Sequence, residues 1–273
     1  MQVVWPSTRS LKDARIWQIG ALAALLAFGI ARLGFGQDVT NIAAILAAAL
    51  LTQAVLSWAF ALERFDPLSP IITSLSLSIL LRANGPELLA LAAAAAMASK
   101  FLIRIYGKHV FNPANFAIVL ALASGEAWIS PAQWGSAAWS AFLFASLAIL
   151  VLSRAKRADI AIAFLLDFAG FAFARAGYLG DPLAIPLKQL QSGAVLLFAF
   201  FMISDPKTTP DKRGARILYA VLVAAFAHYL VFWRYIPEGL MYALFFLSPL
   251  VPLMDRIRPI SKEHRFSWAR PTV

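Results

Sequence analysis

Apolar segments alternate with short polar stretches along the whole chain. A helix needs about 20 apolar residues to cross a bilayer. Three of the segments, 70–81, 111–123 and 190–203, are distinctly shorter, and short spans are typical of broken or re-entrant helices that line an interior site. The ten segments that the pattern predicts lie at about 16–35, 40–62, 70–81, 86–105, 111–123, 136–153, 158–177, 190–203, 214–233 and 238–254.

The composition indicates a polytopic membrane protein. Of the 273 residues, 61% are hydrophobic and only 14% are charged, whereas soluble domains carry about 25% charged residues. There is no cysteine, which excludes disulfides and cysteine-ligated iron–sulfur clusters in this chain. The histidines have no metal-ligand spacing, so we expect no metal site.

The basic residues predict the orientation. With ten spans, 19 of the 24 Lys and Arg residues fall in the two tails and in the loops after the even-numbered segments. Cytoplasmic loops are enriched in Lys and Arg. We therefore expect a multi-pass protein of the bacterial inner membrane with both termini in the cytoplasm. The net charge of +10 has the same explanation, and we expect no nucleic-acid partner. The first segment should be an uncleaved helix and not a signal peptide.

Two stretches resemble each other, DPLSPIITSLSLSILL at 66–81 and DPLAIPLKQLQSGAVLLFAF at 181–200. A proline-led short segment follows in each half. Five segments per copy is an odd number, so the copies should insert with opposite orientations, with a site at their interface. The predicted organisation is a tail at 1–15, repeats at 16–130 and 131–255, and a basic tail at 256–273.

The short segment around residue 195 carries the most distinctive motif. Ser192, Gly193 and Ala194 precede Val195, and Asp205-Pro206 closes the apolar run. The start of such a helix presents unpaired N–H groups that suit an anion such as phosphate. A plain helix boundary with small packing residues explains the same letters, and both interpretations stay open.

These residues carry a family likeness. The run SGAVLLFAFFMISDPKTTPDKRG, the run IPEGLMYALFFLSPLVPLMDR and the segment YGKHVFNPANFAIVLAL resemble the RnfD/NqrB family of membrane subunits in ion-pumping redox complexes. The likeness spans about residues 40 to 258. It implies an all-α fold of ten transmembrane helices in two inverted five-helix repeats, related to urea and ammonium channels.

The resemblance also implies a flavin. Family members join FMN through its phosphate to a threonine that ends a Ser-Gly-Ala-Thr motif, and this motif maps onto Ser192–Val195. Val195 has no hydroxyl group, so covalent FMN at this position is impossible. A non-covalent FMN or riboflavin, or the loss of the flavin, remains, and in this respect the chain resembles divergent UnbU-like members.

Four more residues are candidates for polar roles inside the membrane. Asp167 lies mid-span, where a carboxylate is costly, so it either serves a cation or proton pathway or pairs with a basic residue. His228 either relays protons or packs with a hydrogen bond. Asn112 and Pro113 start a short segment and should line a polar interior.

Lys100 and Arg104, four residues apart, could hold a phosphate or a quinone headgroup. We interpret them instead as part of the positive collar on the cytoplasmic side.

The leading hypothesis is an RnfD/NqrB-like subunit of an electron-transport complex, which could be coupled to cation translocation. We expect it to be at most a non-catalytic or electron-relay subunit, with no catalytic residue, because the chain has no dinucleotide fingerprint and no cysteine for iron–sulfur ligation. The expected partners are the bilayer, other redox subunits and a quinone. The alternatives are a channel or transporter for a small solute or ion, and a membrane scaffold for a soluble partner.

Overall fold

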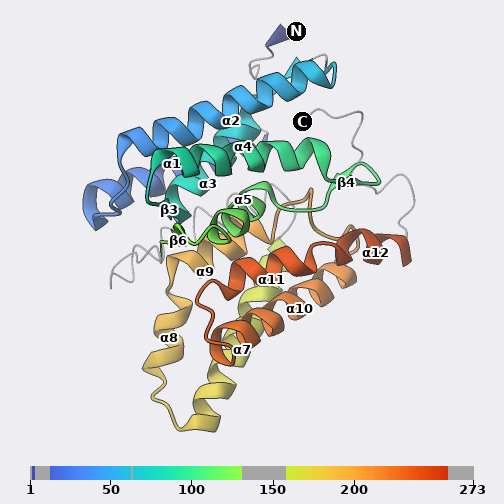
Figure 1. Ribbon diagram of the computed structural model, residues 1–273. Helices are drawn as coiled ribbons and strands as arrows, with labels where there is room; N and C mark the ends of the chain where they lie inside the picture. Colours follow the sequence, from blue (N-terminus) through green and yellow to red (C-terminus); the bar gives the residue numbers. More distant parts are fainter. Residues whose placement is uncertain (1, 4–12, 63, 131–157, 258–273) are drawn as a thin grey trace. The chain divides into compact units, whose positions relative to one another are not determined.

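The computed structural model describes residues 2–3, 13–62, 64–130 and 158–257. These residues form two compact units, with those up to residue 130 in unit 1 and those from residue 158 in unit 2. Both units are mainly helical (Figure 1). The described part of the chain contains four helices that are long and apolar enough to cross a membrane, or up to six if each of two bent helix pairs counts as one span. The prediction of a mostly helical, polytopic membrane protein is confirmed at this level.

Unit 1 contains five helices and three short two-stranded ladders. The strands are β1 (Gln2–Val3), β2 (Arg64–Phe65), β3 (Leu81–Ala83), β4 (Arg104–Ile105), β5 (Lys108–His109) and β6 (Ala127–Ile129). β1 pairs with β2 in parallel, while β3 with β6 and β4 with β5 pair antiparallel. The helices are α1 (Ala14–Leu33), α2 (Val39–Ala59), α3 (Leu68–Leu80), α4 (Pro86–Leu102) and α5 (Pro113–Leu122).

Local sequence signals set the helix ends in unit 1. The Asp13 carboxylate accepts the Arg15 backbone N–H at 3.0 Å, and the Asp38 carboxylate caps α2 in the same way. Such side-chain caps satisfy N–H groups that have no partner within the helix. Between β4 and β5, Tyr106 and Gly107 both have positive φ, the conformation of a tight two-residue hairpin turn.

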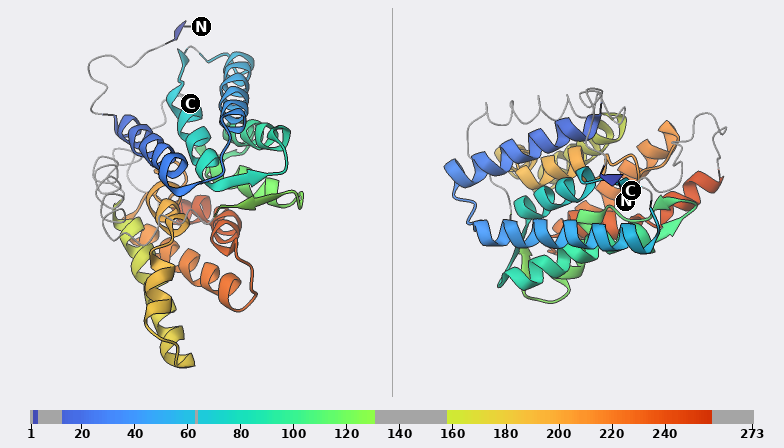
Figure 2. Two further views of the ribbon diagram at one scale, coloured as in Figure 1. Left: turned by 90° about the vertical axis from the view of Figure 1, so that its left-hand side faces the viewer. Right: turned by 90° about the horizontal axis from the view of Figure 1, so that it is seen from above.

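The core of unit 1 forms around α2 and α4. α2 packs against α3 and α4, α4 also packs against α5, and α1 packs against α3. Figure 2 shows the same helices from two further directions. The inward face of α2 is a stripe with helical spacing, Ile45, Ala49, Gln53 and Ser57, all buried. Half of this stripe is polar, which is unusual for a helix of membrane-spanning length.

Unit 2 contains two long helices and several short ones. They are α7 (Ala158–Leu179), α8 (Ala184–Leu190), α9 (Gly193–Leu197), the π-helix η2 (Phe198–Met202), α10 (Arg213–Phe232), α11 (Gly239–Leu247) and α12 (Leu250–Ile257). α10 packs against both α7 and α11.

Helices α7 and α10 run parallel. Asp159 contacts Arg216 in the first turns of the two helices, Phe171 contacts His228 further along, and Arg175 lies over the Phe232 ring near the ends. The sequence separation is the same in all three pairs. Each residue of α7 therefore lies level with the residue of α10 that is 57 positions later in the sequence.

Several predicted segments match helices of the structure. α1, α2, α4, α7 and α10 begin and end within three residues of their predicted bounds, and α3 and α5 are short as expected. The segment predicted at 136–153 lies outside the described residues.

Two other segments are broken. The short segment predicted at 190–203 corresponds to α9 and η2, which together cover residues 193–202, and a bend of 48° at Gln191 and Ser192 separates it from α8. The segment predicted as one helix at 238–254 is wrong in detail, because α11 and α12 meet at a bend of 43°. Pro249 lies between them and provides no backbone N–H to continue α11.

Candidate functional site

The motif around Val195 starts a very short helix. Ser192 is the N-cap of α9, and its side chain makes no capping hydrogen bond. Gly193 and Val195 are buried, Val195 with 5% exposure, while Ser192 and Ala194 are partly exposed. The Leu196 backbone N–H donates to the Ser192 carbonyl at 3.1 Å, which continues the helix. The sequence prediction of a helix start at this point is therefore confirmed in position.

The apolar run beyond Val195 becomes a π-helix. All five residues of η2 are buried, and π-helical turns of this length occur frequently at functional sites. The Ser204 hydroxyl donates to the Phe200 carbonyl at 2.5 Å. The Asp205 carboxylate accepts the Lys207 backbone N–H at 2.9 Å, so Asp205 and Pro206 form a side-chain-closed turn. Ser192–Val195 and Asp205-Pro206 thus lie at opposite ends of one short helical segment, α9 with η2.

The residues of this segment do not fit a covalently bound FMN. A phosphoester needs a hydroxyl group at the attachment point, and Val195 offers only methyl groups that are buried within unit 2. Ser192 has a hydroxyl and is partly exposed, but it belongs to the cap and not to the helix. Position 195 therefore provides no attachment point for a flavin phosphate.

Asn112 and Pro113 begin α5 as predicted. The Asn112 side chain accepts the Asn115 backbone N–H at 3.1 Å, and Pro113 occupies the first helical turn. Asn115 itself is completely buried, and neither atom of its amide has a hydrogen-bond partner among the residues that the structure describes. The predicted polar interior position in α5 therefore extends to Asn115, which was not predicted from the sequence.

Asp167 lies on the α10-facing side of the middle of α7. It is partly exposed. Within the described ranges, its carboxylate forms no hydrogen bond and no ion pair, although the charged residues nearer both ends of α7 are paired. The alternative that Asp167 pairs with a neighbouring basic residue is therefore not realised in this part of the chain.

His228 packs between two phenylalanine rings. Its ring centroid lies 5.5 Å from that of Phe171 and 4.6 Å from that of Phe232. The buried Nδ1 atom has no hydrogen-bond partner among the described residues. Arg175 lies over the same Phe232 ring at 4.9 Å and reaches the Asp181 carboxylate at 3.5 Å. The prediction that His228 packs against its neighbours is thus confirmed, whereas the predicted hydrogen bond is not seen at Nδ1 within the described residues.

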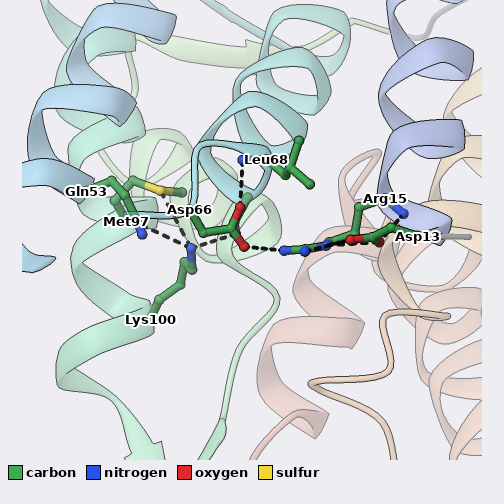
Figure 3. Close-up of polar contacts among 8 residues, drawn as sticks. Asp13, Arg15, Gln53, Asp66, Leu68, Met97 and Lys100 are labelled. Carbon is green, nitrogen blue, oxygen red and sulfur yellow. Dashed lines mark hydrogen bonds and ion pairs between the residues drawn. The ribbon is translucent and has the colours of Figure 1, made fainter. Parts of the chain in front are cut away.

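A polar cluster inside unit 1 was not anticipated from the sequence. The Lys100 side chain is 1% exposed, and its Nζ donates to Ser69 Oγ at 2.6 Å and to Gln53 Oε1 at 3.2 Å. Figure 3 shows Lys100 reaching from α4 towards Gln53 and Met97, with Asp66 and Arg15 on the other side of the start of α3. Asp66 binds the Arg15 guanidinium and accepts the Leu68 backbone N–H at 3.0 Å.

The interpretation of Lys100 as part of an exposed positive collar is therefore wrong. Lys100 continues the buried stripe of α4 that includes Leu89, Ala93 and Ala96, so its side chain points into unit 1. The neighbouring Arg104 is partly exposed and donates to the Lys100 carbonyl. The helical spacing of this stripe, and of Gln53 on α2, was the signal that could have located the cluster.

The structure thus places the predicted site residues in separate groups. Asn112 and Pro113 belong to unit 1, and the others belong to unit 2. Within unit 2, His228 and Asp167 lie on the facing sides of α10 and α7, whereas the Ser192 motif and Asp205-Pro206 lie at the two ends of α9 and η2.

Comparison with known proteins locates the family signal in the second half of the chain. Residues 130–262 match the model of the NQR2, RnfD, RnfE family. Over these residues the chain is similar to members of this family. The match covers the described part of unit 2, including both long helices and both bent pairs.

Curated relatives agree with this similarity. The chain is 35% identical over 125 residues to the D subunit of an ion-translocating oxidoreductase complex from Psychromonas ingrahamii, which covers 45% of this chain and 35% of the relative. The protein of the same name from Citrobacter koseri is 29% identical over 160 residues, covering 58% of this chain and 43% of the relative. The chain therefore spans less than half the length of these relatives.

Proposed function

We propose that this chain is a membrane subunit of an ion-translocating electron-transfer complex, with a role similar to that of the relatives it resembles. The match over residues 130–262 carries the proposal. It is supported by the membrane-length helices in both units. The chain has no cysteine, so iron–sulfur centres of such a complex would belong to partner subunits.

The proposed arrangement has ten spans in two inverted repeats, with both termini on the cytoplasmic side of the bacterial inner membrane. The similar order of elements in the two units supports the repeats. In each unit an Asp-Pro-Leu sequence follows a long helix and leads into a short or broken helix. The charge asymmetry of the loops supports the orientation.

The proposed partners are the bilayer, other redox subunits and a quinone as a diffusible acceptor. The test is purification of the tagged chain from its native membrane in mild detergent. A stable assembly with flavin or iron–sulfur absorbance that bleaches on reduction is expected, and it should be lost when the chain is deleted. A monodisperse chain without redox-active partners would contradict the proposal.

We further propose that any flavin in this chain is FMN or riboflavin held non-covalently. The absence of a hydroxyl at Val195 supports this part. Absorbance between about 350 and 550 nm, measured before and after acid precipitation of the purified chain, tests it. Yellow colour in the supernatant is expected for a non-covalent flavin, whereas yellow colour in the pellet would mean covalent attachment elsewhere.

A channel or transporter without redox chemistry is the second candidate. The specific observation in its favour is the unpaired Asp167 carboxylate inside a membrane-length helix, as far as the described residues extend. Purified chain in proteoliposomes that conducts an ion or small solute without any electron donor would support this candidate over the first.

A further inference from the structure

Asp167 lies at the depth of the membrane middle. α7 has 22 residues, and at 1.5 Å per residue it is about 33 Å long, close to the thickness of the hydrocarbon core. Asp159 and Arg175 are eight residues before and after Asp167, so each lies about 12 Å away along the helix axis. Of the two carboxylates in α7, Asp159 lies in the first turn and Asp167 lies near the middle of the helix.

The charges nearest the ends of this helix are neutralised within the protein. Asp159 receives two hydrogen bonds from the Arg216 guanidinium, at 2.5 and 2.9 Å. Arg175 reaches Asp181. Asp167 has no such partner in the described residues, and a charged carboxylate at the centre of a bilayer costs about 2.5–3.5 kcal/mol even on the most lenient insertion scale. None of the described side chains lowers this cost when the carboxylate is ionised, so a bound cation is the remaining way to neutralise it within this part of the chain.

A small side chain lies level with Asp167, and an imidazole lies one helical turn further along. The parallel register that places Phe171 beside His228 puts Asp167 level with Ala224 on α10. Phe171 lies one helical turn after Asp167 on α7, and its ring contacts that of His228, whose Nδ1 has no hydrogen-bond partner among the described residues. The charged or titratable side chains on the elements packed against α7 are Arg213, Arg216, Tyr219, His228 and Tyr229 on α10 and Lys188 on α8.

We propose that the Asp167 carboxylate is a binding site for a monovalent cation in the middle of the membrane, taking up either a proton or Na⁺. Either cation neutralises the carboxylate, which removes the cost of burying its charge. This proposal rests on the proposed function for its purpose, because the bound cation would be one that the complex moves. The binding itself is a property of this chain alone.

The test uses dicyclohexylcarbodiimide, a lipid-soluble reagent that modifies protonated carboxyl groups, on the purified full chain in lipid nanodiscs. Mass spectrometry of the digested protein identifies the modified residue. We expect modification at Asp167, and none at this position in Asp167→Asn. In the matched control Asp181→Asn, which changes the carboxylate nearer the helix end, Asp167 should still be modified.

Added NaCl, compared with choline chloride at equal ionic strength, distinguishes the two cations. If Na⁺ binds, it slows the modification of Asp167 about tenfold at ten times its dissociation constant, by mass action. If the site takes only a proton, NaCl has no effect and the modification slows as pH rises. Both results support a cation site at Asp167.

An unmodified Asp167 at low pH, under conditions that modify a control carboxylate introduced by Leu166→Asp, would overturn the proposal. Leu166 is exposed on the neighbouring surface of α7, so a carboxylate at this position is accessible to the reagent and shows that the conditions modify carboxylates at this depth. Because the experiment needs no partner subunit, its failure is separate from a failure of the proposed redox complex. A chain that is modified at Asp167 but purifies without redox partners would support the cation site and favour a transporter.

Discussion

Units 1 and 2 bury similar helical stripes but fill them with different chemistry. On α2 the buried residues are Ile45, Ala49, Gln53 and Ser57, and on α7 the same spacing is occupied by Phe164, Phe168, Ala172 and Ala176. The positions of Gln53 and Ser57 in unit 1 thus correspond to two alanines in unit 2. The two stripes have the same spacing, but only the stripe of α2 contains polar side chains.

A second pair of helices, α4 in unit 1 and α10 in unit 2, extends the comparison. The buried residues of α4 include Leu89, Ala92, Ala93, Ala96, Met97 and Lys100. Those of α10 with the same spacing are Arg216, Tyr219, Ala220, Val223, Ala224 and Ala227. Lys100 therefore corresponds to Ala227.

Ser69, the third member of the Lys100 cluster, also corresponds to an alanine in unit 2. Ser69 is three residues after Asp66, and Ala184 is three residues after Asp181. All three hydrogen-bonding residues in unit 1 thus correspond to alanines in unit 2. The same helical spacing thus holds either a hydrogen-bonded polar cluster or apolar packing at these positions. The cluster leaves Gln53 Nε2 without a partner among the described residues, so its stability depends on the bonds that Lys100 makes.

The largest expected effect concerns the orientation of the two units. In the proposed repeats the connection after α2 is equivalent to the connection after α7, and an inverted arrangement puts the two on opposite sides of the membrane. Because the chain has no cysteine, single substitutions Ala61→Cys and Tyr178→Cys report each side; both positions are exposed. With a membrane-impermeant maleimide on spheroplasts, Tyr178→Cys should be labelled at once and Ala61→Cys only after permeabilisation. Equal labelling of both variants before permeabilisation would exclude inversion.

A smaller effect is expected from breaking the polar cluster in unit 1. Lys100→Ala leaves the buried Gln53 amide without its donor, so we expect a loss of about 3 kcal/mol in the free energy of unfolding. This corresponds to a fall in Tm of about 6–12 °C, measured by thermal unfolding in detergent.

The triple variant Lys100→Ala, Gln53→Ala, Ser69→Ala copies the side chains of unit 2. It removes all three partners together, so it should recover more than half of the Tm lost by Lys100→Ala alone. Lys188→Met, which removes an exposed lysine ammonium from α8, is the control and should leave Tm unchanged. A triple variant that is less stable than Lys100→Ala would show that the two units do not follow the same packing rule.

The smallest of the three effects concerns the ion pair that is particular to unit 2. Arg216 corresponds to Leu89 in the buried stripes, and its side chain and that of Asp159 are 10% and 15% exposed. Arg216→Ala should lower the stability by about 2 kcal/mol, because it leaves the Asp159 carboxylate unpaired near the membrane surface. The double variant Arg216→Leu, Asp159→Asn should lose less in the same thermal measurement. Equal losses would mean that the pair contributes through packing and not through charge.

The sequence alone determined the membrane class, the long helices and most of their ends. Runs of apolar residues decide which segments can be helices in a bilayer, and Asp13, Asp38 and Asn112 act as caps through contacts only two or three residues away. The family motif was also readable, because it depends on the order of residues and not on their arrangement in space.

Only the tertiary structure decided which polar groups meet. Lys100 binds residues of α2 and α3 that are 47 and 31 positions away, and the bends at Ser192 and Pro249 appear as distinct helices only once the chain is folded. It also decided that, among the described residues, Asp167 stays unpaired while Asp159 does not, since both are single carboxylates in the same helix. Partner choice depends on which helices pack together and in which register, and the apolar pattern that predicts each helix carries almost no information about either.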